Sequence, residues 1–329
     1  MKYEFDKDKL VENIVKRKAK HVLIQLPEGM KKEALSFVDI IEKANVKVSV
    51  SGSGAWGGCD LAVDEARKIN ADLIVHFGHA PFVNAKFPVI YVELDAKMKI
   101  VPIIEKNLDK IKVKRLGLVS SVQFIKQIEE IKDFLMSKNK DVVIPGKKGF
   151  AHYDGHVVGC EYNSLKDINV EGYLVIGNRF HALGAALMVD KPVYLLDEHK
   201  EDIFLMDKER DKIIKQRAQA IHKIKNAEKI GILVDMKLGQ YNLKIAELLK
   251  KDLVKLGKEV VIISSREITP NGLMSFYDLD GFINTACPRI GIDDYTKYEK
   301  PIINSREANV IIGRKSWESL LKEGLVGFF

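Results

Sequence analysis

The sequence predicts an α/β fold of three repeated βα domains, each with a mostly four-stranded parallel sheet flanked by helices, whose strand ends converge on a central site. Short apolar runs alternate with amphipathic helical patterns along the chain, which is typical of parallel sheets with crossover helices. The runs also align in three sets with a period of about 105 residues, and such self-similarity indicates a triplicated unit. We expect the repeats to span residues 1–98, 99–205 and 206–329.

Each repeat contributes four predicted strands in the same order. The first strand of each repeat is Val22–Gln25, Leu116–Val119 or Gly231–Val234. The second is Val46–Val50, Val142–Ile144 or Val260–Ile263, and the third is Leu73–Val75, Tyr173–Ile176 or Gly281–Ile283. An acid precedes each third strand within two residues, namely Asp72, Glu171 and Asp280. A fourth strand opens after a proline in every repeat, namely Pro88, Pro192 and Pro301. Proline at the start of a strand loses no important ladder hydrogen bond.

A helix is predicted between the first and second strands of each repeat, because apolar residues recur there at spacings of three and four. The three apolar stripes are Ala34, Phe37, Val38 and Ile41; Phe124, Ile128, Ile131 and Leu135; and Ile245, Leu248, Leu249 and Leu253. The stretch Met206–Lys229 is predicted to be a helix leading into the third repeat. Its buried face would carry Ile214, Ala218 and Ile221, and its Lys and Arg residues would form a solvated face.

Composition and charge narrow the class of protein. No stretch reaches the ~18 apolar residues of a membrane span, and the first twenty residues are too charged for a signal peptide. Three cysteines cannot all pair within one chain, so we expect a reducing, cytoplasmic location. The net charge of 53 − 46 = +7 favours an acidic partner. Because this excess is spread along the chain without a basic block, we expect no direct nucleic-acid binding.

The three cysteines fall one in each repeat, just beyond the carboxyl end of a predicted strand, where open parallel sheets bind ligands. Cys59 and Cys160 follow the second strands of their repeats, and Cys287 follows a third strand. We interpret them as one shared site. Three thiolates suit a [4Fe–4S] cluster with one open iron, or a zinc ion with a fourth ligand from His or water. Three unrelated buried thiols are the simpler alternative, since free cysteine is commonly a core residue.

Other catalytic motifs are weak or missing. Gly52–Gly57 matches G-x-G-x-x-G, but it follows a second strand, and no acid ends the next strand to bind a ribose. The sequence contains no P-loop, G-x-S-x-G or H-E-x-x-H motif. Phosphoryl transfer by a P-loop, serine hydrolysis and zincin chemistry are therefore unsupported.

Nearly the full length of the chain resembles the archaeal diphthamide-biosynthesis enzymes, the 2-(3-amino-3-carboxypropyl)histidine synthases. The three cysteines are the most specific part of this resemblance. The local segments that carry it are Leu23–Gly29, Gly54–Ala62, Val75–Pro81, Gly177–Gly184, Leu233–Gln240 and Asn284–Asp294.

The resemblance implies a radical transferase. Cys59, Cys160 and Cys287 would hold a [4Fe–4S] cluster and act through it, with S-adenosylmethionine as substrate at the open iron. One electron would cleave the bond from sulfur to the methionine γ-carbon, giving methylthioadenosine and a 3-amino-3-carboxypropyl radical. That radical would add to the imidazole of a histidine in translation elongation factor 2, the first step of diphthamide biosynthesis. Family members in archaea are homodimers, so we expect one here; the electron donor cannot be named from the sequence.

We also predict residues of the S-adenosylmethionine pocket. Arg289 is the first candidate for the methionine carboxylate, because a guanidinium fork matches a carboxylate. The remaining candidates, which follow strands, are Arg179, His181, Gln240 and His79. Arg289 and His181 each have a simpler alternative role: Arg289 would pair with Asp293 or Asp294, and His181 would cap a helix.

Two other functions compete with the transferase. A quinolinate-synthase-like dehydratase would use a similar three-cysteine [4Fe–4S] cluster as a Lewis acid, but the local segments match it poorly. A non-catalytic scaffold or electron-relay subunit would not need all three cysteines. Three doubly wound units also suit a nucleotide-sugar or phosphoribosyl enzyme, since one fold hosts many chemistries.

Overall fold

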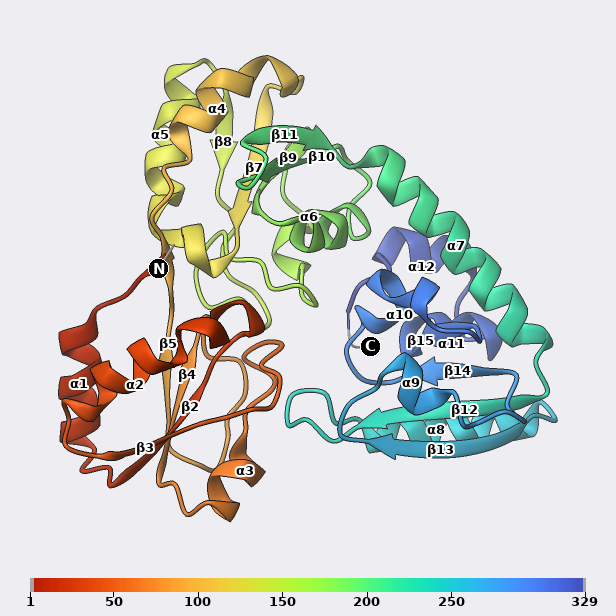
Figure 1. Ribbon diagram of the computed structural model, residues 1–329. Helices are drawn as coiled ribbons and strands as arrows, with labels where there is room; N and C mark the ends of the chain where they lie inside the picture. Colours follow the sequence, from red (N-terminus) through yellow and green to blue (C-terminus); the bar gives the residue numbers. More distant parts are fainter. Residues whose placement is uncertain (1–2, 328–329) are drawn as a thin grey trace. The chain divides into compact units, whose positions relative to one another are not determined.

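The computed structural model describes residues 3–327 and confirms the predicted fold class of parallel sheets flanked by helices (Figure 1). The described chain forms two compact units. The first contains the residues up to Lys99 together with Val122–Lys126 and Lys237–Gly239, and the second contains the rest. Among the described residues, no helix is both long and apolar enough to span a membrane.

The sheet of the first unit has four parallel strands in the order β3-β2-β4-β5. These strands are β2 (His21–Gln25), β3 (Lys47–Val50), β4 (Leu73–Phe77) and β5 (Val89–Val92). The helices are α1 (Lys7–Lys16), a 3-10 turn over Glu28–Glu33, α2 (Ala34–Glu42) and α3 (Val63–Lys68). Helices α1 and α2 bury Ile14 and Phe37 against one face of the sheet, and α3 buries Ala66 against the other. Two short strands, β1 (Tyr3–Glu4) and β6 (Asp95–Ala96), form an antiparallel pair.

The second unit contains two sheets. One has the order β8-β7-β9-β10-β11, in which β11 is antiparallel to β10 and the other strands are parallel. Its strands are β7 (Arg115–Ser120), β8 (Asp141–Val143), β9 (Gly172–Gly177), β10 (Val193–Asp197) and β11 (Asp202–Leu205). Its helices are α4 (Val101–Asn107), α5 (Ile128–Ser137) and α6 (Arg179–Ala186), with 3-10 turns over Leu108–Lys110 and Asn163–Leu165. A further 3-10 turn over Val122–Gln127 precedes α5, and all of it except Gln127 belongs to the first unit.

The other sheet of the second unit has four parallel strands in the order β13-β12-β14-β15. These are β12 (Lys229–Asp235), β13 (Glu259–Ser265), β14 (Gly281–Asn284) and β15 (Ile302–Asn304). The long helix α7 (Asp207–Asn226) leads into it (Figure 1). The remaining helices are α8 (Leu243–Lys255), α9 (Pro270–Leu273), α10 (Ile290–Asp293), α11 (Ser305–Ile311) and α12 (Trp317–Glu323), with a 3-10 turn over Tyr295–Lys297.

All twelve predicted strands are confirmed, and the three large sheets share one order in which the first strand lies between the second and the third. The acid before each third strand has the same role in every sheet. Asp72, Glu171 and Asp280 each accept two backbone N–H groups at or just before the start of the neighbouring first strand, at 2.7–3.2 Å. These backbone hydrogen bonds lower the pKa of the Glu171 and Asp280 carboxyl groups. The repeat therefore extends from the strand order to individual hydrogen bonds.

Two predicted buried faces were wrong in part, and one helix begins later than predicted. Leu248 was expected on the buried stripe of α8 but is 50% exposed, because that helix packs on Ala246, Leu249 and Leu253 instead. Phe124 is buried as expected, yet it lies in a 3-10 turn before α5. The buried face of α7 is displaced by about one residue from the predicted one and includes Arg217, which was expected in solvent.

Candidate functional site

The loop that carries Cys59 is fixed by a glutamine at the end of β2. Gln25 is buried; its Nε2 donates to the Asp60 carbonyl at 2.7 Å, and its Oε1 accepts the Ala62 N–H at 3.1 Å. These two bonds hold the loop on the carboxyl side of Cys59. A polar side chain at the end of an apolar run therefore holds the loop of Cys59, and both groups of its amide are satisfied.

Glycines allow backbone segments to approach Cys59 closely. A Cβ atom on Gly58 would lie 2.6 Å from the Ala80 carbonyl oxygen. A Cβ atom on Gly239 would lie 2.4 Å from the Cβ of Cys59, and the Gly239 N–H donates to the Cys59 carbonyl at 2.9 Å. Residues Lys237–Gly239, which follow β12 in the chain, thus pack in the first unit. The Cys59 side chain itself is partly exposed and forms no disulfide.

Two histidines lie behind this loop. His76 in β4 is the register partner of both Gln25 in β2 and Tyr91 in β5, so the three residues form one row across the sheet. The Nδ1 of His76 lies 2.9 Å from Gln25 Oε1, and its Nε2 lies 2.9 Å from the Nδ1 of His79. Burial lowers the pKa of His76 to about 3 and that of His79 to about 4. Both rings are therefore neutral at physiological pH.

Cys160 lies at the tip of a tight turn in the second unit. Val158 and Glu161 bridge each other, and the Glu161 N–H donates to the Val158 carbonyl at 3.1 Å. The loop before the turn extends the edge of β7, because Ser120 exchanges backbone hydrogen bonds with Gly155 and Val157. The cysteine is partly exposed.

A phenylalanine connects the Cys160 turn with the loop of Cys287. A Cβ atom on Gly159 would lie 1.6 Å from a ring carbon of Phe180, so only glycine fits beside Cys160. On the same ring stacks Arg289, whose guanidinium carbon is 4.2 Å from the ring centroid. Phe180 thus contacts both cysteine-bearing loops of the second unit.

Arg289 is buried, and an acid of its own helix holds it. Its Nη2 donates to Asp293 Oδ1 at 2.7 Å and to the Phe180 carbonyl at 3.0 Å, while Nε approaches Oδ2 at 2.6 Å as an ion pair without hydrogen-bond alignment. Burial raises the pKa of Asp293, and Arg289 opposes that rise. The Nη1 of Arg289 is buried and lacks a hydrogen-bond partner among residues 3–327. The predicted pairing with Asp293 is present, and it leaves the N–H groups of Nη1 without an acceptor in the described residues.

The Cys287 loop is fixed by two asparagines that are register partners at the ends of β14 and β15. Asn284 Nδ2 donates to the Cys287 carbonyl at 2.8 Å and to Asn304 Oδ1 at 2.8 Å. Asn304 Nδ2 donates to the Pro288 carbonyl at 2.7 Å, and its N–H donates to Glu307. The loop backbone on both sides of the Cys287–Pro288 bond is therefore anchored.

A buried ion pair lies behind these asparagines. Arg217 of α7 binds Glu307 of α11 through two hydrogen bonds of 2.7 and 2.6 Å, and its Nη2 also donates to the Ile302 carbonyl. Glu307 forms a capping box with Asn304 at the start of α11. The charge pair thus supports the strand end that holds the Cys287 loop.

The other predicted pocket residues have varied surroundings. Arg179 is exposed and pairs with Glu209 at 2.8 Å. His181 is not the cap of α6, since Asn178 accepts its N–H; the His181 carbonyl accepts the hydroxyl of buried Tyr162 at 3.0 Å. Burial raises the pKa of Tyr162, as does Cys160. Gln240 is buried after β12, and its carbonyl accepts from Asn242.

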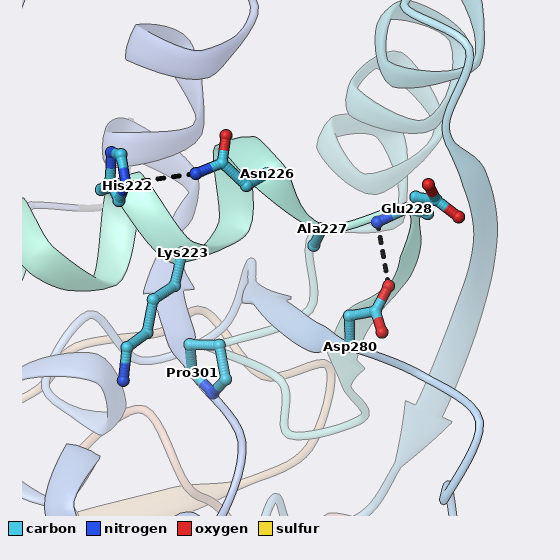
Figure 2. Close-up of a pocket in the computed structure, with 7 residues that line it drawn as sticks. All are labelled: His222, Lys223, Asn226, Ala227, Glu228, Asp280 and Pro301. Carbon is cyan, nitrogen blue, oxygen red and sulfur yellow. Dashed lines mark hydrogen bonds between the residues drawn. The ribbon is translucent and has the colours of Figure 1, made fainter.

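A cavity of about 570 Å³ lies at the other end of the third sheet, and none of the predicted site residues lines it (Figure 2). Asp280 and Pro301, which precede β14 and β15, form part of its wall. The Asp280 carboxylate already accepts the Glu228 N–H at 2.9 Å, and His222 contacts Asn226. This cavity is therefore separate from the carboxyl strand ends that carry the cysteine loops.

Within the second unit, the loops of Cys160 and Cys287 meet around Phe180, while Cys59 belongs to the first unit. In the described part of the chain, no three His, Cys, Asp or Glu side chains form a group able to hold a metal ion. The predicted convergence of the three cysteines stays a prediction.

Sequence reasoning missed the residues that hold the loops. Gln25, His76, Asn284 and Asn304 all lie near the ends of apolar strands, and all are buried. The available signal was a polar side chain inside an apolar run, since such a residue needs a partner when it is buried.

Comparisons with known proteins agree with this architecture. Residues 26–321 match the family described as "Putative diphthamide synthesis protein". The 2-(3-amino-3-carboxypropyl)histidine synthase of Pyrococcus horikoshii is 32% identical over 97% of this chain and 93% of its own length. Subunit 1 of the same enzyme from Schizosaccharomyces pombe is 30% identical over 97% of this chain and 76% of its own length.

A solved structure of a related protein is similar over nearly the whole chain. The crystal structure of Dph2 from Pyrococcus horikoshii with a 4Fe-4S cluster is 29% identical and has a TM-score of 0.90, covering 99% of this chain and 95% of that one. The match extends over all three large sheets, so it includes every loop that carries a cysteine. The chain therefore belongs to the diphthamide synthesis family, and it is an enzyme of the transferase class.

Proposed function

We propose that this protein transfers the 3-amino-3-carboxypropyl group of S-adenosylmethionine to a histidine of translation elongation factor 2, the first step of diphthamide biosynthesis. The observation that carries the proposal is the similarity to named synthases over 97% of the chain. The relative with a bound 4Fe-4S cluster covers the same length.

Cys59, Cys160 and Cys287 would hold the [4Fe–4S] cluster. Their chemistry fits this role, because none of the three forms a disulfide and all are partly exposed and located in loops after strands. Buried side chains anchor the backbone of two of these loops, at Asp60 and at Cys287. When bound, the cluster supplies one electron at low potential, which cleaves the bond between the sulfonium sulfur and the methionine γ-carbon.

Arg289 would bind the methionine carboxylate. Its guanidinium is held in place by Asp293 and Phe180, and its buried Nη1 keeps one donor for a ligand. A buried donor without a partner is costly, and an incoming carboxylate oxygen would satisfy it. The further pocket residues of the proposal are His181, Arg179, Gln240 and His79, all of which follow strands of their sheets.

The proposed setting is a cytoplasmic homodimer that acts on a protein substrate. The net charge of +7 is compatible with an acidic partner surface. Residues 1–98, 99–205 and 206–329 would form the three domains, each built around one of the large sheets.

Anaerobic purification tests the proposal. We expect about four iron and four sulfide per chain for a cluster of this type. After reduction, the enzyme should convert S-adenosylmethionine to methylthioadenosine, and mass spectrometry should find the 3-amino-3-carboxypropyl group on elongation factor 2. Ala variants of each cysteine should lose iron, with Ser137→Ala as the control for an exposed helix residue. An intact cluster without methylthioadenosine would refute the transferase and favour a Lewis-acid enzyme.

A further inference from the structure

A row of buried polar side chains in the first unit has a hydrogen-bond pattern that can be assigned completely. It runs from the Cys59 loop through Gln25 and His76 to His79. The orientation of the Gln25 amide is fixed first, because a backbone carbonyl only accepts and a backbone N–H only donates. Its nitrogen must face the Asp60 carbonyl, and its oxygen must face the Ala62 N–H.

The tautomers of both histidines follow from this orientation. Gln25 Oε1 is an acceptor, so the His76 Nδ1 at 2.9 Å must carry a proton. A neutral His76 then has its lone pair on Nε2, which must accept from the His79 Nδ1 at 2.9 Å. His79 is thereby also held as the Nδ1–H tautomer, with the lone pair on Nε2. The reverse arrangement would require an amide oxygen to donate.

Backbone geometry sets the direction of the His79 ring. Gly78, at the end of β4, has a φ of +86°, a conformation that other residues rarely adopt, and this turn brings His79 back to His76. The following residue, Ala80, packs against Gly58 beside Cys59. His79 therefore lies at the same carboxyl end of the sheet as the Cys59 loop, and its side chain is only partly buried.

We propose that Gln25 and His76 are positioning residues that hold His79 in one neutral tautomer, so that His79 binds a hydrogen-bond donor of S-adenosylmethionine through Nε2. This inference rests on the proposed function. Of the polar groups of that substrate, the ammonium, the ribose hydroxyls and the amino group of adenine are donors, whereas the carboxylate is not. The low pKa of His79 agrees with a neutral ring.

The tautomers can be measured without any activity. In full-length protein labelled with ¹⁵N-histidine, long-range ¹H–¹⁵N spectra at pH 7 should show Nε2 unprotonated in both rings, with signals assigned from His76→Gln and His79→Gln variants. In His76→Leu, His79 loses the His76 acceptor of its Nδ1 proton and keeps only the backbone hydrogen bond with Phe77, so the other tautomer should become more populated. A protonated Nε2 in either wild-type ring would overturn the proposal.

Binding of S-adenosylhomocysteine to the cluster-loaded enzyme tests the ligand contact. Loss of one hydrogen bond should weaken binding about tenfold in His79→Leu, and His79→Gln, whose side-chain oxygen can reach the position of Nε2, should stay within about threefold. His222→Leu, an exposed histidine in the other unit, is the control and should bind as the wild type does.

Methylthioadenosine, which lacks the amino-acid part, separates the ammonium from the donors of the nucleoside. If His79→Leu weakens the binding of both ligands, a ribose hydroxyl or the adenine amino group is the donor; if it weakens only the binding of S-adenosylhomocysteine, the ammonium is. Equal effects of the Leu and Gln variants, or no effect of Leu, would overturn the contact. Absence of any binding to the wild type would instead refute the proposed function, and the tautomer measurement would still stand as a separate result.

Discussion

Replacing Arg217 with methionine should destabilise the protein strongly, because it leaves a buried charge without its partner. Arg217 and Glu307 are 0% and 1% exposed, and two hydrogen bonds join them. Breaking one partner of such a pair costs about 3–5 kcal/mol. With an m-value of about 2–3 kcal/mol per molar urea, the unfolding midpoint should fall by roughly 1–2.5 M.

The fluorescence of Trp317 reports this change locally. The chain has two tryptophans, and a Trp56→Phe background removes the other, which is 65% exposed. Trp317 packs partly buried against the cores of both sheets in the second unit. Unfolding in urea, followed through this single tryptophan, therefore gives the free energy of unfolding around the ion pair.

Two further variants make the measurement decisive. Arg217→Met combined with Glu307→Leu removes both charges and should recover more than half of the loss, with about 1 kcal/mol still missing for the capping box. Arg314→Met breaks an ion pair in which the side chains of Arg314 and Asp252 are 50% and 23% exposed. This change should lower the free energy of unfolding by at most about 1 kcal/mol. A loss below about 1 kcal/mol for Arg217→Met alone would refute the reasoning.

Three other predictions concern separate parts of the molecule. Gly239→Ala should lower bound iron severalfold, because its Cβ would lie 2.4 Å from the Cβ of Cys59; Gly52→Ala, with no atom within 4 Å, should keep its iron, and equal iron content in both variants would contradict this. Asp280→Asn should lower the urea midpoint more at pH 7 than at pH 3. The folded pKa of Asp280 is lowered, so its stabilisation is present above the ordinary pKa of about 3.9 and is lost as the pH falls through the folded pKa; a pH-independent difference would exclude this cause. Arg289→Lys should weaken S-adenosylhomocysteine binding about tenfold, measured by calorimetry, because lysine has no planar fork; unchanged affinity would remove Arg289 from the carboxylate site.

Local sequence patterns were sufficient for the twelve strands of the repeats, but they missed the antiparallel strands β1, β6 and β11. Twelve strands were located because each is a short apolar run with a turn or a proline beside it, and that signal lies within a few residues. The acid before each third strand was also visible, although its two backbone hydrogen bonds to the first strand were not. The position of each cysteine after a strand required no more than this local information.

The faces of helices were less predictable. Arg217 was assigned to solvent because a charged residue on a helix is usually exposed, yet its partner Glu307 lies ninety residues away and draws it inside. Leu248 was assigned to the core although α8 turns it outward. Apolar spacing gives the approximate direction of a buried face, but neighbouring elements decide which residues at its margin are covered.

The sequence by itself determined the α/β class, the threefold repeat and the three cysteine-bearing loops, since these depend on contacts within short segments. Only the tertiary structure decided how the loops are held. Gln25 meets His76, and Asn284 meets Asn304, because the register of parallel strands sets side by side residues that are 20 to 51 positions apart. Hydrogen-bond partners that are so far apart in the sequence leave no periodic pattern from which they can be predicted. In the folded protein these side chains are buried, so each of them needs its hydrogen-bond partner.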